Sequence, residues 1–115
     1  MVHITAKYTG GLKCEAVHGP SGAQMITDAP ADIGGTATTF SPTDLTATAL
    51  ITCIMTTMAL VAERNGLKLD SMTGDIEKTM RMSPPRRIDT LTINLHMPIE
   101  SSHPLREKLE HAAHA

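Results

Sequence analysis

The sequence predicts an α+β fold, in which mainly antiparallel strands pack on one long, buried central helix. Two observations support this: apolar and polar residues alternate with period two early and late in the chain, and an uncharged run from Leu45 to Ala62 separates these regions. The length of 115 residues is that of one domain. We therefore expect a single domain over residues 1–115, with the element order β-β-β-α-β-β-α.

The first quarter of the chain predicts a three-stranded meander. Alternating patterns cover residues 2–8 and 12–16, with a Gly-Gly turn between them, and a third, shorter run covers 23–27. Residues 28–40 are rich in Gly, Pro and small side chains and predict a loop, in which Gly34-Gly35 permits positive φ or a close backbone approach. Neither phosphate-binding pattern, GxGxxG or GxxxxGK[ST], is present.

A long helix is predicted from Pro42 to Asn65. Ser41 is a suitable N-cap, and Asp44, three residues later, completes a box-like capping pattern. Asp44 is also a candidate general acid or base, but we favour the capping role. Gly66 follows the helix as a stop signal.

The uncharged run in this helix has the length of a membrane span. Five threonines interrupt it and no basic cluster flanks it, so we expect no membrane insertion. A helix that is apolar nearly all round is otherwise a buried one, and a chain this short has little material to cover every side. The run therefore suggests a partner subunit.

After the helix, period two returns. One strand places Ile76, Met80 and Met82 on a common face and ends at Ser83, and the clearest strand pattern follows over 91–99. Arg86-Arg87 lies between them and reads as an exposed basic turn. A second helix is predicted from Ser102, with Pro104 in its first turn, still continuing at Ala115.

Composition excludes several classes of function. The formal net charge is −2, and the chain has one Phe, one Tyr and no Trp, so it offers neither a basic surface nor base-stacking platforms for nucleic acid. The first residues lack the basic start and apolar run of a signal peptide, so we expect a cytoplasmic location. In that compartment the two cysteines are expected to be thiols.

Few side chains suggest chemistry by pattern alone. Cys53 lies in the middle of the long helix, where a packing role is the simpler interpretation, and Cys14 falls at an apolar strand position. Glu107, His111 and His114 share one face of the second helix, as metal ligands or, as we favour, as a solvated face. No cofactor-binding motif is found, and we expect neither a cofactor nor a metal.

Several short motifs together resemble the OsmC and organic hydroperoxide resistance superfamily. They are Gly10-Gly11, Asp28-Ala29-Pro30, Gly34-Gly35, the helix start Phe40-Ser41-Pro42-Thr43-Asp44-Leu45, the helical Cys53, and Gly66-Leu67. The resemblance implies an intertwined homodimer, with central helices packed between sheets that both chains help to form. It also implies thiol-dependent reduction of organic hydroperoxides in oxidative stress defence, with a thiol reductant and an active site at the dimer interface.

Within this resemblance, Cys53 matches the cysteine that attacks the peroxide. The family's second, resolving cysteine, with its closing strand and helix, would come just after Ala115, where this sequence ends. Either the chain is a truncated form or it lacks the usual resolving step. Where the peroxidase branch has a glutamate after the proline, this chain has Thr43 followed by Asp44. The arginine of that branch near the first hairpin has no match, because Lys7 and Lys13 are the only basic side chains there.

A rival hypothesis is a non-catalytic dimer of the same family. It would bind a small apolar molecule between the subunits, with Met55, Met58 and Leu60 as an adaptable lining. In that case Cys53 would serve packing alone.

Overall fold

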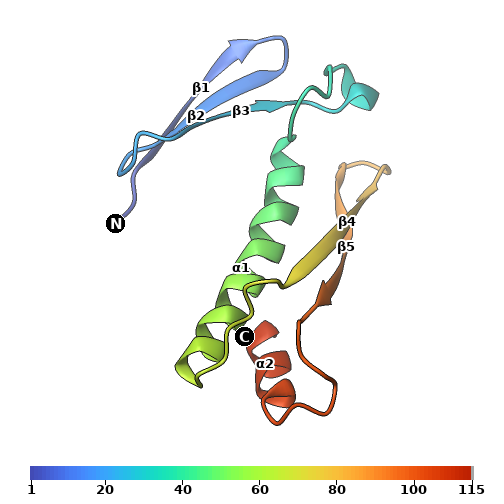
Figure 1. Ribbon diagram of the computed structural model, residues 1–115. Coiled ribbons are helices and arrows are strands. Elements are labelled where there is room, and N and C mark those ends of the chain that lie inside the picture. Colours follow the sequence, from blue (N-terminus) through green and yellow to red (C-terminus); the bar gives the residue numbers. More distant parts are fainter. Residues whose placement is uncertain (115) are drawn as a thin grey trace. The chain divides into compact units, whose positions relative to one another are not determined.

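The computed structural model describes residues 1–114 and shows an α+β fold with two antiparallel sheets and one long helix (Figure 1). The element order is the predicted one, with a short 3₁₀ turn added between the third strand and the helix. The chain divides into two compact units, Met1–Thr46 and a second unit that begins at Ala47. Each is described by itself below.

The first unit contains the predicted meander. Strands β1 (Ile4–Gly10), β2 (Lys13–His18) and β3 (Gln24–Asp28) pair antiparallel in chain order. Each strand begins one or two residues later than predicted. In the first turn Gly10, Gly11 and Leu12 all have positive φ, and the register shifts between Tyr8 and Gly10.

The loop after β3 depends on both of its adjacent glycines. A 3₁₀ turn, η1 (Ala31–Ile33), ends at Gly34, whose φ of +99° favours glycine. A Cβ at Gly35 would overlap the backbone carbonyl of Ala29, so only glycine fits there. Both roles predicted for this glycine pair, positive φ and close approach, are therefore present at successive positions.

Helix α1 (Pro42–Arg64) begins with the predicted capping box. The backbone N–H of Asp44 donates to Ser41 Oγ at 3.1 Å, and the N–H of Ser41 donates to Asp44 Oδ2 at 2.9 Å. The helix ends one residue before the predicted Asn65, and Gly66 follows with a φ of +75°. Asp44 is confirmed as a capping residue.

The buried residues of helix α1 lie on one face of the helix. Its buried residues are Ala47, Ile51, Met58 and Ala62. Leu50 and Leu60 are 40% and 46% exposed. By length and composition alone, α1 also meets the criteria for a membrane-crossing helix, although such criteria are also met by the core helix of a soluble protein. The predicted burial is therefore only partly supplied by the chain itself.

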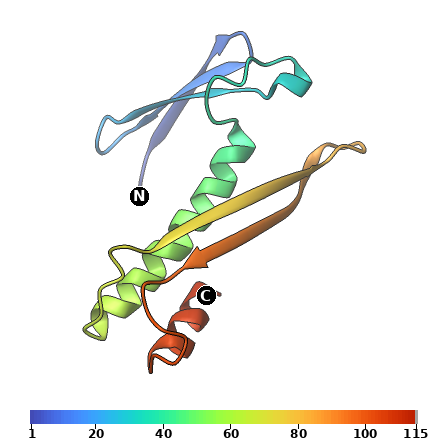
Figure 2. The ribbon, with the colours of Figure 1, turned by 45° about the vertical axis from the view of Figure 1, so that its right-hand side comes forward.

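The second unit contains a hairpin of β4 (Thr73–Arg81) and β5 (Arg87–His96). Figures 1 and 2 show this hairpin lying along α1, and a Cβ added at Gly74 would lie 3.2 Å from Ile51 Cδ1 of that helix. Three predictions were wrong in detail. Met82 lies in the turn. Arg87 belongs to β5, where strand pairing with Arg81 extends the hairpin toward its tip. The strand predicted over 91–99 ends at His96.

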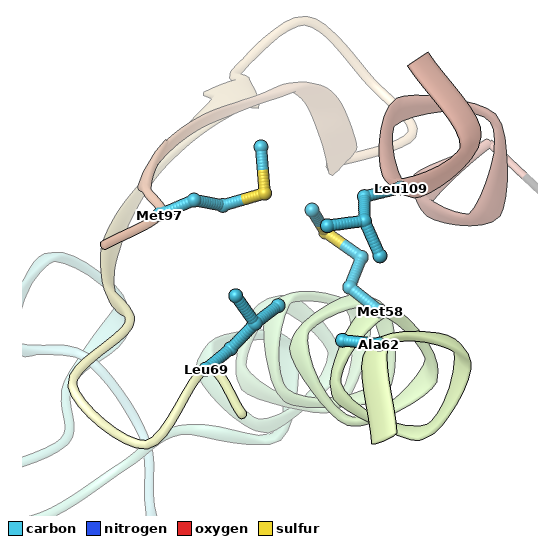
Figure 3. Close-up of a cluster of buried hydrophobic side chains, with 5 residues drawn as sticks. All are labelled: Met58, Ala62, Leu69, Met97 and Leu109. Carbon is cyan, nitrogen blue, oxygen red and sulfur yellow. The ribbon is translucent and has the colours of Figure 1, made fainter. Parts of the chain in front are cut away.

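A small hydrophobic core holds the second unit together (Figure 3). Met58 and Ala62 of α1 meet Leu109 of α2 (Arg106–Ala113), together with Leu69 and Met97 from the segments that flank the hairpin. Helix α2 is shorter than predicted at both ends.

Helix α2 begins later than predicted because residues 101–105 form turns, in which the N–H of Leu105 donates to His103 Nδ1 at 3.1 Å. Its end at Ala113 shows that the expected continuation of the helix through His114 was wrong.

Candidate active site

Cys53 lies on a stripe of α1 beside the core. The stripe consists of Leu50, Cys53, Ile54 and Thr57, at the spacing that places side chains on one helix face. Ile54 packs against the core, whereas Cys53 is an exposed free thiol. The described residues of this chain therefore do not bury Cys53.

The end of α2 supplies the facing wall of a hollow at Cys53. Ala112, Ala113 and His114 line it together with the α1 stripe and enclose about 230 Å³. Leu109, which is 1% exposed, fixes α2 against Met58 one turn before this end (Figure 3). Packing of the two helices thus brings residues more than fifty positions apart to one site.

The lining of this hollow is mostly apolar and includes two titratable side chains. Leu50, Ile54 and the two alanines contribute hydrocarbon, and Thr57 contributes a hydroxyl. Cys53 and His114 are the titratable residues of the lining. The volume is slightly below that of drug-sized pockets, which begin at about 300 Å³. The site therefore suits a small molecule with an apolar part and a group that reacts with a thiol.

The position of Cys53 within α1 limits what the helix itself can do for the thiol. Cys53 lies roughly 16 Å along the axis from Pro42, at 1.5 Å per residue. The field of the helix dipole fades beyond the first turn. Activation of this thiol therefore requires another side chain.

Lys13, one of two lysines considered as a substitute for the missing arginine, is already engaged. Its Nζ donates to Asp28 Oδ2 at 2.8 Å and to Thr36 Oγ1 at 2.8 Å. Lys7, the other, lies opposite Glu15 in the β1–β2 register. The structure thus gives Lys13 a role within the first unit.

Asp28 is the centre of this network, and sequence analysis missed it. Its carboxylate is fully buried and accepts hydrogen bonds from Lys13, from the hydroxyl and N–H of Thr36, and from the hydroxyl and N–H of Thr38. The Lys13 ammonium, and then the two threonines, hold the pKa of Asp28 well below its ordinary value. An acidic residue at the end of a strand, before a loop with several threonines, was the available signal.

The remaining candidates are described by the elements that carry them. Cys14 is half-buried on β2, opposite Tyr8 and Thr27, and it is a free thiol. Thr43 Oγ1 lies 3.2 Å from Ser41 Oγ at the helix start. Met58, expected to line an apolar site between subunits, is 2% exposed in the chain's own core, so that expectation was wrong for Met58.

No group of three or more His, Cys, Asp or Glu side chains in residues 1–114 is arranged to hold a metal ion. Glu107 and His111 are exposed on α2. On the same helix, Arg106 Nε donates to Glu110 Oε1 at 2.9 Å, as expected of a solvated face.

Comparison with known proteins identifies a family and solved structures that share this architecture. Residues 35–115 match the family model described as OsmC-like protein. A crystal structure from Psychrobacter arcticus, described as an osmotic stress induced and detoxification response protein, is 31% identical, with a TM-score of 0.90 over 98% of this chain and 82% of that one. The search of curated proteins found no match.

Two further structures share the fold at lower identity. One, from Legionella pneumophila, is described as "an organic hydroperoxide resistance protein OsmC, predicted redox protein, regulator of sulfide bond formation"; it is 19% identical, with a TM-score of 0.72 over 99% of this chain and 82% of that one. The other, an OsmC-like protein of unknown function from Vibrio cholerae, is 13% identical, with a TM-score of 0.75 over 99% of this chain and 87% of that one. With the family model covering most of the sequence, the chain belongs to the OsmC-like protein family.

Proposed function

We propose that this chain is a thiol-dependent peroxidase of the OsmC-like family, in which Cys53 reduces organic hydroperoxides. One observation carries the proposal: Cys53 presents an exposed thiol at the wall of a small, mostly apolar hollow. An alkyl hydroperoxide has the matching parts, an apolar group for the lining and an O–O bond for the thiol. The name given to the Legionella protein of the same fold agrees with this class of substrate.

The proposed reaction has two stages. The Cys53 thiolate attacks the terminal oxygen of the hydroperoxide, the O–O bond breaks, and the products are a sulfenic acid on Cys53 and an alcohol. A thiol reductant then condenses with the sulfenic acid, releasing water, and a second reductant thiol displaces Cys53 as a thiol. In this scheme the reductant supplies both electrons, and Cys14, the other cysteine within residues 1–114, takes no part.

We further propose that the protein acts as a cytoplasmic homodimer, with residues 1–115 as one domain. The exposed apolar side chains of α1, such as Leu50 and Leu60, support this, because a helix this apolar is ordinarily covered on most of its sides. Light scattering tests the assembly directly. A monodisperse monomer would contradict the dimer and leave the exposed face of α1 to another partner.

The catalytic test compares two cysteine substitutions. Cys53→Ser and the matched control Cys14→Ser are assayed for consumption of cumene hydroperoxide, with excess dithiothreitol as the reductant. We expect Cys53→Ser to fall to the rate of the uncatalysed reaction and Cys14→Ser to retain activity. After one equivalent of hydroperoxide without reductant, mass spectrometry should place one added oxygen atom on Cys53.

Full activity of Cys53→Ser would refute the mechanism. So would a wild-type protein that consumes no hydroperoxide, and the apolar hollow would then favour the rival hypothesis of a non-catalytic ligand-binding dimer.

A further inference from the structure

We infer that His114 is the proton-transfer partner of Cys53, taking the thiol proton before peroxide attack and returning a proton to the leaving alkoxide. This inference rests on the proposed function. His114 lines the same hollow as Cys53, although it directly follows α2 and lies 61 positions later in the chain. Nothing in the local sequence around either residue links the two.

The fold gives His114 a defined place at the end of α2. Its backbone is still in the helical region, with a φ of −97°, and its N–H donates to the carbonyl of His111 at 3.1 Å. The helix itself is anchored to α1 through the buried Leu109. His114 therefore sits on a packed helix end beside the α1 stripe.

The end of α2 also suits the charge that proton transfer creates. The unpaired carbonyl groups at a helix C-terminus favour a cation, and an imidazolium at His114 would lie among them. A thiolate on Cys53 across the hollow would favour the same charge. The helix end thus favours the charge that His114 would carry after proton transfer.

Among the described residues of the lining, no other offers this chemistry. Helix α1 contributes Cys53 itself, and His114, directly after α2, is the second titratable residue. The lining includes no residue of β4 or β5. Thr57 carries a neutral hydroxyl, and Glu110 and His111 of α2 are outside the lining. Histidine is also the side chain whose charge ordinarily changes between pH 5 and 8.

Protons are conserved over the first stage of the proposed reaction. The thiol of Cys53 gives its proton to the His114 imidazole, and the resulting thiolate attacks the hydroperoxide. The O–O bond breaks toward an alkoxide, which takes the proton from the His114 imidazolium. The net change is thiol plus hydroperoxide to sulfenic acid plus alcohol, with the histidine regenerated.

Alkylation of Cys53 tests this inference without any peroxide. In a Cys14→Ser background, the rate of reaction with iodoacetamide is measured from pH 5 to 9 for wild type, His114→Gln and the matched control His111→Gln. His111 is an exposed histidine one turn earlier on α2, outside the lining. We expect His114→Gln to slow alkylation at pH 7 by roughly tenfold or more, and to shift the rise in rate toward the higher pH at which an unassisted thiol ionises.

Added imidazole should restore part of the lost rate, which a purely structural defect would not allow. An alkylation profile of His114→Gln that overlays that of wild type would overturn the inference. Equal slowing by His111→Gln would also overturn it, because the effect would then belong to the helix end as a whole. If His114→Gln fails to fold, His114→Asn provides the same comparison with a shorter amide.

The two proposals fail separately. Hydroperoxide consumption that survives Cys53→Ser refutes the peroxidase function but leaves the alkylation profile to report on the histidine. An unchanged profile in a protein whose activity depends on Cys53 refutes only the role of His114.

Discussion

Replacing Leu109 by alanine should uncouple α2 from α1 and disassemble the hollow at Cys53. Leu109 is 1% exposed and packs in the core with Met58 and Ala62. The substitution removes three carbon atoms, worth about 2.4 kcal/mol at about 0.8 kcal/mol per buried methylene. The cavity left behind raises the expected loss to about 3–4 kcal/mol, within the range for fully buried leucines. For a chain this size, that lowers Tm by roughly 10–20 °C.

The assay is chemical and thermal unfolding at one fixed protein concentration, since a dimer makes apparent stability concentration-dependent. The matched control is Leu12→Ala, because Leu12 is 45% exposed and the same substitution there should cost only about 1 kcal/mol. In Leu109→Ala, alkylation of Cys53 should also lose its dependence on His114. Equal destabilisation by the two substitutions would refute the reasoning, because α2 would then not be docked through Leu109.

Two further predictions concern the first unit. Gly35→Ala should destabilise the protein by at least about 3 kcal/mol, because the added Cβ meets the Ala29 backbone. Gly34→Ala should cost only about 1–2 kcal/mol, because an alanine there must adopt a left-handed φ. Unfolding curves that rank the two variants in the opposite order would contradict this prediction. The lowered pKa of Asp28 implies stability that is fully present above the unfolded value of about 3.9 and is lost as pH falls below it.

Asp28→Asn should therefore be less stable than wild type at pH 7, where Lys13 loses its counter-charge, and the difference should shrink as pH falls below about 4. Unfolding in urea across this pH range provides the measurement. A difference that stays constant down to the lowest pH would show that the Asp28 charge is not what holds the loop.

Local signals determined much of this molecule from sequence alone. The capping box at Ser41, the stop at Gly66 and the paired roles of Gly34 and Gly35 each depend on residues a few positions apart. Such interactions follow from backbone geometry, so the residue types predict them. The family resemblance, carried by the same local motifs, likewise gave the OsmC-like fold that the family model and the related structures support.

Tertiary structure decided what these elements do together. Met58 and Leu60 are both apolar residues of the same uncharged run, so the sequence does not separate their roles. In the fold, Met58 packs in the core with Leu109, whereas Leu60 is exposed. Likewise, sequence places Cys53 in a helix and His114 on a polar face, whereas the docking of α2 brings them to one hollow. The physical reason is range: capping and turns are settled within a few residues, while burial and the meeting of reactive groups depend on partners far along the chain.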